Sequence, residues 1–140
     1  MAINNSNNLE LLDFRDSDLI LKIVMELYNE IWTDSKKWNT NLQKIERYLI
    51  EILALNPNET RALTNLGVIL SNNGKYQNAL SKLKQAERLN SKDANLYKNI
   101  GIVKLNIEPE RQNAKEYFDI AKTMKADKLT IEAYFDPHAY

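Results

Sequence analysis

Residues 65–90 read NLGVILSNNGKYQNALSKLKQAERLN, and the spacing of their small and apolar residues decides the fold. Apolar residues recur there at intervals of three and four, which is typical of amphipathic helices. Gly74 separates two such runs, and glycine readily adopts the left-handed conformation that ends helices. Gly67 lies inside a run, where glycine costs about 1 kcal/mol relative to alanine. We therefore expect a helix–turn–helix unit in which Gly67 and Ala79 let two backbones approach closely.

The same pattern recurs further along the chain. The stretch Asn65–Gly67 returns 34 residues later as Asn99–Gly101. Ala79, in the following helix, corresponds to Ala114 at a spacing of 35, because one extra residue falls in the turn that contains Pro109. Recurrence at a fixed period of this size is the signature of stacked helical repeats.

A 34-residue helical hairpin with small residues at these positions resembles the tetratricopeptide repeat. The residues that carry the resemblance are Leu66, Gly67, Gly74, Tyr76, Ala79, Leu83, Ala86 and Leu89. The resemblance implies an all-α fold, a right-handed solenoid of about three helical hairpins with a C-terminal capping helix. It also implies a non-catalytic module that binds a protein or peptide partner through the concave face of the solenoid.

The chain is expected to form one domain over residues 1–140. Its parts are a flexible N-terminus at 1–15, a divergent repeat at 17–57, repeats at 58–93 and 94–126, and a capping helix with a tail at 127–140.

The ends of the individual helices are also predicted from local signals. Asp16 or Ser17 is a plausible N-cap for the first helix, and Asn58 for the helix over about 59–72. Pro109 suits the first turn of the helix that ends near Lys125. Helical spacing places the first helix's apolar residues on one face: Leu19, Ile23, Leu27 and Ile31.

The composition excludes several classes of function. The 140 residues carry 19 basic and 19 acidic side chains, so no basic surface for nucleic acid or anionic membranes is expected. There is no cysteine, and the single histidine, His138, lies three residues from the end. No arrangement of residues resembles a catalytic, metal or phosphate site. We predict no enzyme activity, no cofactor, no metal, no membrane contact and a cytoplasmic location.

We assign the partner-binding face to the side of each repeat's first helix that points away from the core. Asn65 and Asn99, one period apart, should lie side by side there, and an amide both donates and accepts hydrogen bonds, which suits the backbone of an extended peptide. A simply solvated polar face is the alternative. The predicted binding residues are Arg61, Thr64, Asn65, Val68, Asn72, Asn95, Lys98, Asn99 and Ile102.

Two further alternatives concern partners. A small module suits a dedicated role, such as a bacterial toxin-immunity protein, an assembly chaperone or a secretion adaptor. A different class is a self-associating structural repeat, with a homodimer formed through aromatic segments near the two ends. Those segments are the pair Trp32 and Trp38 and the stretch KLTIEAYFDPHAY at 128–140, which otherwise forms the capping helix.

Overall fold

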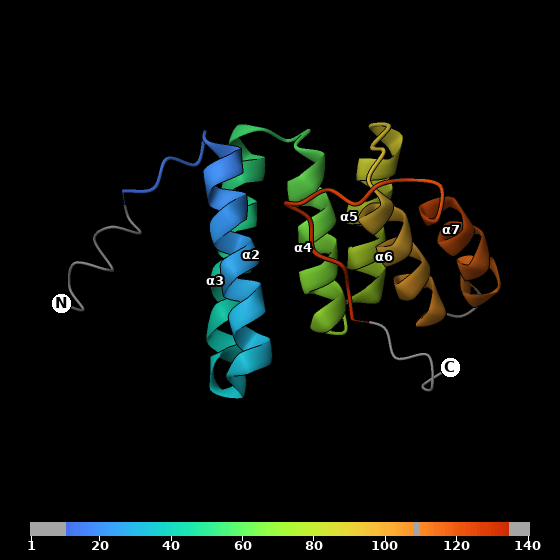
Figure 1. Cartoon of the computed structure of the whole chain (residues 1–140), viewed down its shortest axis with the longest axis horizontal. Coiled ribbons are helices and arrows are strands. Elements are labelled where there is room, and N and C mark those ends of the chain that lie inside the picture. Colours follow the sequence, from blue (N-terminus) through green and yellow to red (C-terminus); the bar gives the residue numbers. More distant parts are fainter. Residues whose placement is uncertain (1–10, 108–109, 135–140) are drawn as a thin grey trace.

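The computed structural model describes residues 11–107 and 110–134, and within these ranges the regular secondary structure is helical (Figure 1). The six α-helices of the described residues are α2 (Ser17–Thr33), α3 (Trp38–Leu55), α4 (Thr60–Asn72), α5 (Tyr76–Arg88), α6 (Ala94–Leu105) and α7 (Ala114–Ala121). Two 3₁₀ helices, η1 (Ser35–Lys37) and η2 (Glu110–Asn113), precede α3 and α7. Consecutive helices pack as neighbours, which confirms the predicted all-α stack of helical hairpins.

Gly67 and its repeat counterpart Gly101 mark close helix contacts. A Cβ atom added at Gly67 of α4 would lie 2.5 Å from Leu83 of α5, and one added at Gly101 of α6 would lie 2.9 Å from Phe118 of α7. Both distances are too short for real carbon atoms, so each glycine lets the side chain of the next helix reach the backbone. The predicted role of Gly67 is confirmed.

The turn residues also follow the sequence pattern, with one exception. Gly74 has φ +76°, the left-handed conformation expected of it. Asp16 caps α2 by accepting a hydrogen bond from the Leu19 backbone N–H at 3.1 Å. The N-cap of α4 is Glu59 and not the predicted Asn58, because α4 begins one residue later than expected. Pro109 and His138 lie outside the described residues.

The core face of α2 differs from the predicted one. Leu19 is 44% exposed, and Ile20, Leu21, Val24, Tyr28 and Ile31 are the buried residues of the helix. The predicted stripe was therefore offset by one residue at Leu19, Ile23 and Leu27, because α2 carries apolar residues on more than one side, whereas Ile31 is buried as predicted. On α3 the residues Leu42, Ile45, Leu49 and Ile52 are buried along one face, whereas Leu55 at the end of the helix is exposed.

The C-terminal capping helix was predicted wrongly. Residues 126–134, here named the C-terminal segment, are not helical. In Figure 1 this segment (red) leaves α7, crosses α6, reaches α4 and then turns along it. Most of its hydrogen bonds are made with side chains of α4 and α6, as described below, so its conformation depends on residues that are distant in the sequence.

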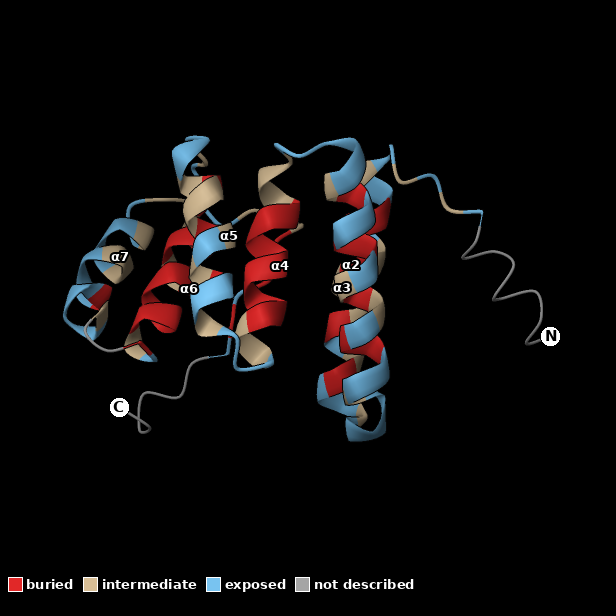
Figure 2. Ribbon diagram, turned by 180° about the vertical axis from the view of Figure 1, so that it is seen from behind, coloured by how far each residue is buried: buried red, intermediate tan, exposed pale blue. Residues whose placement is uncertain are grey.

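Burial in α4 and α6 shows where the segment lies. Nine consecutive residues of α4, from Ala62 to Leu70, are buried, and α6 is buried along most of its length (Figure 2). An amphipathic helix on a surface keeps one side exposed. Here that side is polar and is covered by the C-terminal segment, so the two central helices are enclosed.

Candidate functional site

Asn65 of α4 and Asn99 of α6 hold the backbone of the C-terminal segment. The Asn65 amide nitrogen donates to the Leu129 carbonyl at 3.0 Å, and its oxygen accepts from the Ile131 N–H at 2.7 Å. Asn99 makes the same pair of contacts two residues further along the segment. It donates to the Ile131 carbonyl at 2.8 Å and accepts from the Ala133 N–H at 2.9 Å. Each amide thus makes the paired contacts that a neighbouring β-strand would make.

The first turn of α6 adds further contacts to the segment. The Asn95 amide donates to the Thr130 carbonyl at 3.2 Å and to its hydroxyl oxygen at 3.1 Å. Asp93, the N-cap of α6, accepts from the Asp127 N–H at 2.8 Å. We call the side of α4 and α6 that carries Asn65, Asn95 and Asn99 the amide face. Its contacts are directed mainly at backbone atoms.

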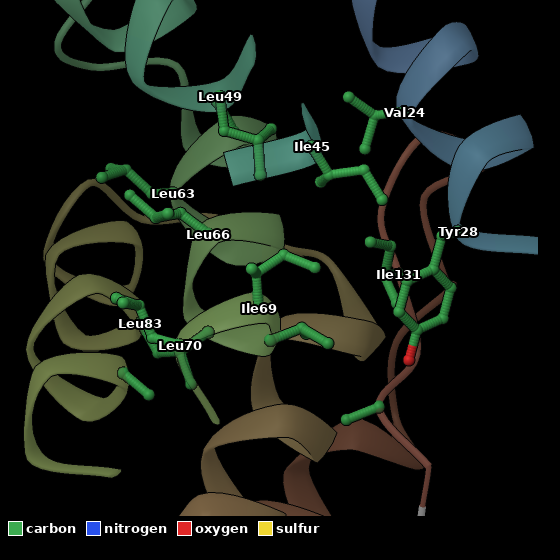
Figure 3. Close-up of a cluster of buried hydrophobic side chains, with 14 of the residues drawn as sticks. Val24, Tyr28, Ile45, Leu49, Leu63, Leu66, Ile69, Leu70, Leu83 and Ile131 are labelled. Atoms are coloured by element: carbon green, nitrogen blue, oxygen red, sulfur yellow. The ribbon is translucent and has the colours of Figure 1, made fainter. Parts of the chain in front are cut away.

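Side chains of the segment make a second set of contacts. Ile131 is 1% exposed and lies between Tyr28 of α2 and Ile69 of α4 (Figure 3). Lys98 of α6 forms an ion pair with Glu132. The Tyr134 ring lies 5.8 Å from the Trp32 ring of α2, measured between centroids. The segment therefore contacts α2, α4 and α6 together.

The free energy that holds the segment is close to balanced. Ordering the five residues 129–133 costs about 5–10 kcal/mol in backbone entropy. The five hydrogen bonds from the three asparagines to this backbone contribute about 2.5–7.5 kcal/mol. Burial of Ile131 contributes about 1.5–3 kcal/mol. The two sides agree within a few kcal/mol, so the segment is held without a large excess of stability.

The Asn65 contact falls within a recognised repeat. A family model described as tetratricopeptide repeat matches residues 48–81, which span the end of α3, all of α4 and the start of α5. These residues are similar to a tetratricopeptide repeat. No curated protein matched the sequence of the chain. Tetratricopeptide repeats are in general non-catalytic folds that bind other proteins, and stacked repeats present extended binding surfaces.

Helices α4 and α6 bring four of the nine predicted binding residues together at the C-terminal segment. Asn65, Asn95, Lys98 and Asn99 all contact the C-terminal segment. Val68 and Ile102 are buried in the core cluster. Thr64 is buried as well, and its hydroxyl donates to the Thr60 carbonyl of its own helix at 2.8 Å.

Two predicted residues lie away from these contacts. Arg61 forms ion pairs with Glu59 at 2.5 Å and with Asp18 of α2 at 2.7 Å. The hydrogen bond to Glu59 is the main cause that raises the pKa of Arg61 above its ordinary value. Asn72 lies at the end of α4 and is half-buried. Arg61 thus links α4 to α2.

Sequence reasoning missed the residues of the segment that fill the amide face. Ile131 and Ala133 were assigned to a capping helix, although β-branched Thr130 and Ile131 lie side by side there, a composition that favours extended backbone. Trp32 and Trp38 were predicted as one of two aromatic segments through which a homodimer would form. Their rings contact each other at 5.3 Å, and Trp32 remains 50% exposed.

The described residues contain neither a cluster of side chains suited to a metal ion nor a helix suited to spanning a bilayer. No group of three or more His, Cys, Asp or Glu side chains within residues 11–107 and 110–134 is placed to hold a metal ion. In the same ranges, no helix combines the length and apolar character needed to span a bilayer. A hollow of about 520 Å³ does lie beside the segment, between the N-terminal ends of α4 and α6.

Proposed function

We propose that the chain is a non-catalytic interaction module that binds an extended segment of a partner protein on its amide face. The observation that carries the proposal is the paired use of the Asn65 and Asn99 amides, each of which donates to and accepts from a peptide backbone. Buried polar groups need such partners, because an unpaired buried amide is costly. A face with this arrangement suits an extended chain.

The proposal retains the predicted partner class and adds a geometry to it. The two asparagines engage residues 129–133 through main-chain atoms, so recognition of a peptide by these amides depends little on its side chains. Main-chain pairing supplies affinity in strand-addition complexes, and side-chain pockets supply specificity. The remaining predicted residue at the face, Lys98, adds a positive charge beside this backbone.

Photocrosslinking tests the proposal in the cells that produce the protein. A benzophenone amino acid replaces Lys98 at the amide face, and the control chain carries it at the exposed position Glu51 of α3. We expect a partner that crosslinks from position 98 and not from position 51, through a single segment identified by mass spectrometry. Identical crosslinked proteins from both positions would contradict the proposal.

The identity of the crosslinked partner separates the dedicated roles. A toxin would indicate an immunity protein, whereas an assembly subunit or a secreted substrate would indicate a chaperone or adaptor. A crosslink between two copies of the chain, together with sedimentation as a dimer, would favour the self-associating class instead.

A further inference from the structure

The C-terminal segment occupies the surface to which a partner would bind. We infer that residues 126–134 are a self-ligand, which fills the amide face in the free protein and is displaced by a partner's extended segment. The partner segment is expected to carry a branched apolar residue followed by an acidic residue, as the chain itself does at Ile131 and Glu132. The existence of a partner rests on the proposed function.

The backbone contacts are exchangeable. Asn65 and Asn99 bind carbonyl and N–H groups of Leu129, Ile131 and Ala133, which every residue except proline supplies. Another extended peptide can therefore make the same four hydrogen bonds. When the segment leaves, the amides become accessible to water, so displacement leaves no polar group stranded.

Two side-chain contacts give the displacing peptide its pattern. Ile131 enters an apolar site between Tyr28 and Ile69, which selects a branched apolar side chain. The next residue, Glu132, meets the Lys98 ammonium group, which selects an acid at that position. Ala133, the next residue of the segment, is 7% exposed, so a small residue fits at that position.

The helices do not need the segment for their own backbone hydrogen bonds. Side chains of α4 and α6 make the bonds to the segment, so its departure leaves the hydrogen bonds within these helices intact. A tethered segment competes at an effective concentration on the order of millimolar. The apparent affinity for a free peptide is lowered by the fraction of molecules whose face is occupied. Weakening the tethered segment should therefore strengthen binding of the same sequence added in trans.

Fluorescence anisotropy with a labelled peptide of residues 126–134, ADKLTIEAY, tests the inference on the full chain. The Ile131→Asp chain places a charge at the buried site and should release its own segment. The matched control is Ile50→Asp, because Ile50 is 52% exposed on α3. We expect the Ile131→Asp chain to bind the peptide at least about tenfold more tightly than the wild-type and Ile50→Asp chains.

A charge exchange tests the pattern by a route that does not disturb the core. Lys98 and Glu132 are both partly exposed, so their substitutions should preserve helicity, as judged by circular dichroism. The Lys98→Glu chain should bind a Glu132→Lys peptide severalfold more tightly than the unmodified peptide. The wild-type chain should show the opposite preference. If the Ile131→Asp chain loses its helical signal, this exchange decides the result.

Several outcomes would overturn the inference. Equal peptide binding by the wild-type and Ile131→Asp chains, with no preference in the charge exchange, would show that the segment is a permanent part of the fold. Sedimentation of the wild-type chain as a dimer that the peptide dissociates would show that the occupant is a second copy. In the first case, a partner crosslinked from position 98 would still show a protein-interaction module, but one that binds beside the occupied face and not through Asn65 and Asn99.

Discussion

At Gly67 the absence of a side chain brings the backbone of α4 against Leu83 of α5. Leu83 is fully buried, so it cannot move aside cheaply. We expect Gly67→Ala to cost about 1–3 kcal/mol through overpacking, offset by about 1 kcal/mol of improved helix propensity. In a Leu83→Ala background the added methyl group has room, and the same change should become neutral or stabilising. Denaturant unfolding of the four chains gives the coupling, and an equal cost in both backgrounds would contradict this account.

Asn99→Asp isolates the donor half of one amide. The variant keeps an acceptor for the Ala133 N–H but faces the Ile131 carbonyl with a second oxygen, 2.8 Å away in the native pair. We expect a loss of about 1–3 kcal/mol in the free energy of unfolding at pH 7. The loss should shrink at pH 4, because a buried carboxyl group that takes up a proton can donate again.

The control for Asn99→Asp is Asn78→Asp, on the exposed side of α5. Thermal unfolding at the two pH values measures both variants. A loss that does not change with pH would mean that the Ile131 carbonyl is not the group that opposes the new carboxylate.

Single residues also show how much of the candidate site could be predicted from the sequence. The 34-residue period predicted that Asn65 and Asn99 would lie side by side and would suit an extended backbone, and both bind one. The period could not predict that this backbone is the chain's own. Nothing local in residues 129–133 marks them as a ligand, because the bonds join positions more than 30 residues apart.

Between elements, Asn41 joins α2 and α3. Its amide donates to the Leu27 carbonyl at 2.9 Å and to the Glu30 carboxylate at 3.1 Å. The hydrogen bond from Asn41 to the Glu30 carboxylate is the main cause that lowers the pKa of Glu30. The positive charges of Lys37 and Lys44 lower it further. A carboxyl group with a lowered folded-state pKa contributes stability above its unfolded value, and this contribution is lost as the pH falls.

We therefore expect the free energy of unfolding to fall as the pH drops below about 4.5, the ordinary pKa of a glutamate. Glu30→Gln should reduce the slope of this acid-induced loss, whereas Glu26→Gln on the exposed side of the same helix should leave it unchanged. Urea unfolding between pH 3 and 7 measures the slopes. Equal slopes in the two variants would mean that Glu30 does not contribute.

Helices that belong to the repeats could be predicted from the sequence, whereas elements whose packing occurs once in the molecule could not. The bounds of α4 follow from local signals, because Gly74 stands just past its end and its N-cap lies one residue from the predicted Asn58. The buried face of α2 was offset because apolar residues surround that helix, so periodicity alone allows more than one orientation. The C-terminal segment carries the apolar residues Leu129, Ile131 and Ala133 at alternate positions, which is the spacing of an extended strand, and its backbone is satisfied by side chains on α4 and α6.

For the whole molecule, we expect two levels of stability. The Ile131 and Ala133 N–H groups should exchange with solvent through opening of the segment, at a lower free energy than the Ile69 and Ile100 groups in the enclosed helices α4 and α6. Hydrogen exchange followed by NMR measures this difference. In the Ile131→Asp chain the Ala133 N–H should lose its protection while Ile69 keeps it. Simultaneous loss at both sites would mean that the segment and the helices unfold together.

The bonding pattern of the two asparagines has a consequence for length. Asn65 binds between residues 129 and 131, and Asn99 between 131 and 133, so one repeat of 34 residues advances the bound backbone by two residues. Two residues of an extended chain measure about 6.6–6.8 Å. In a longer array of such repeats, each added repeat would bind two more residues of the ligand. The number of repeats would thus set the length of the bound segment.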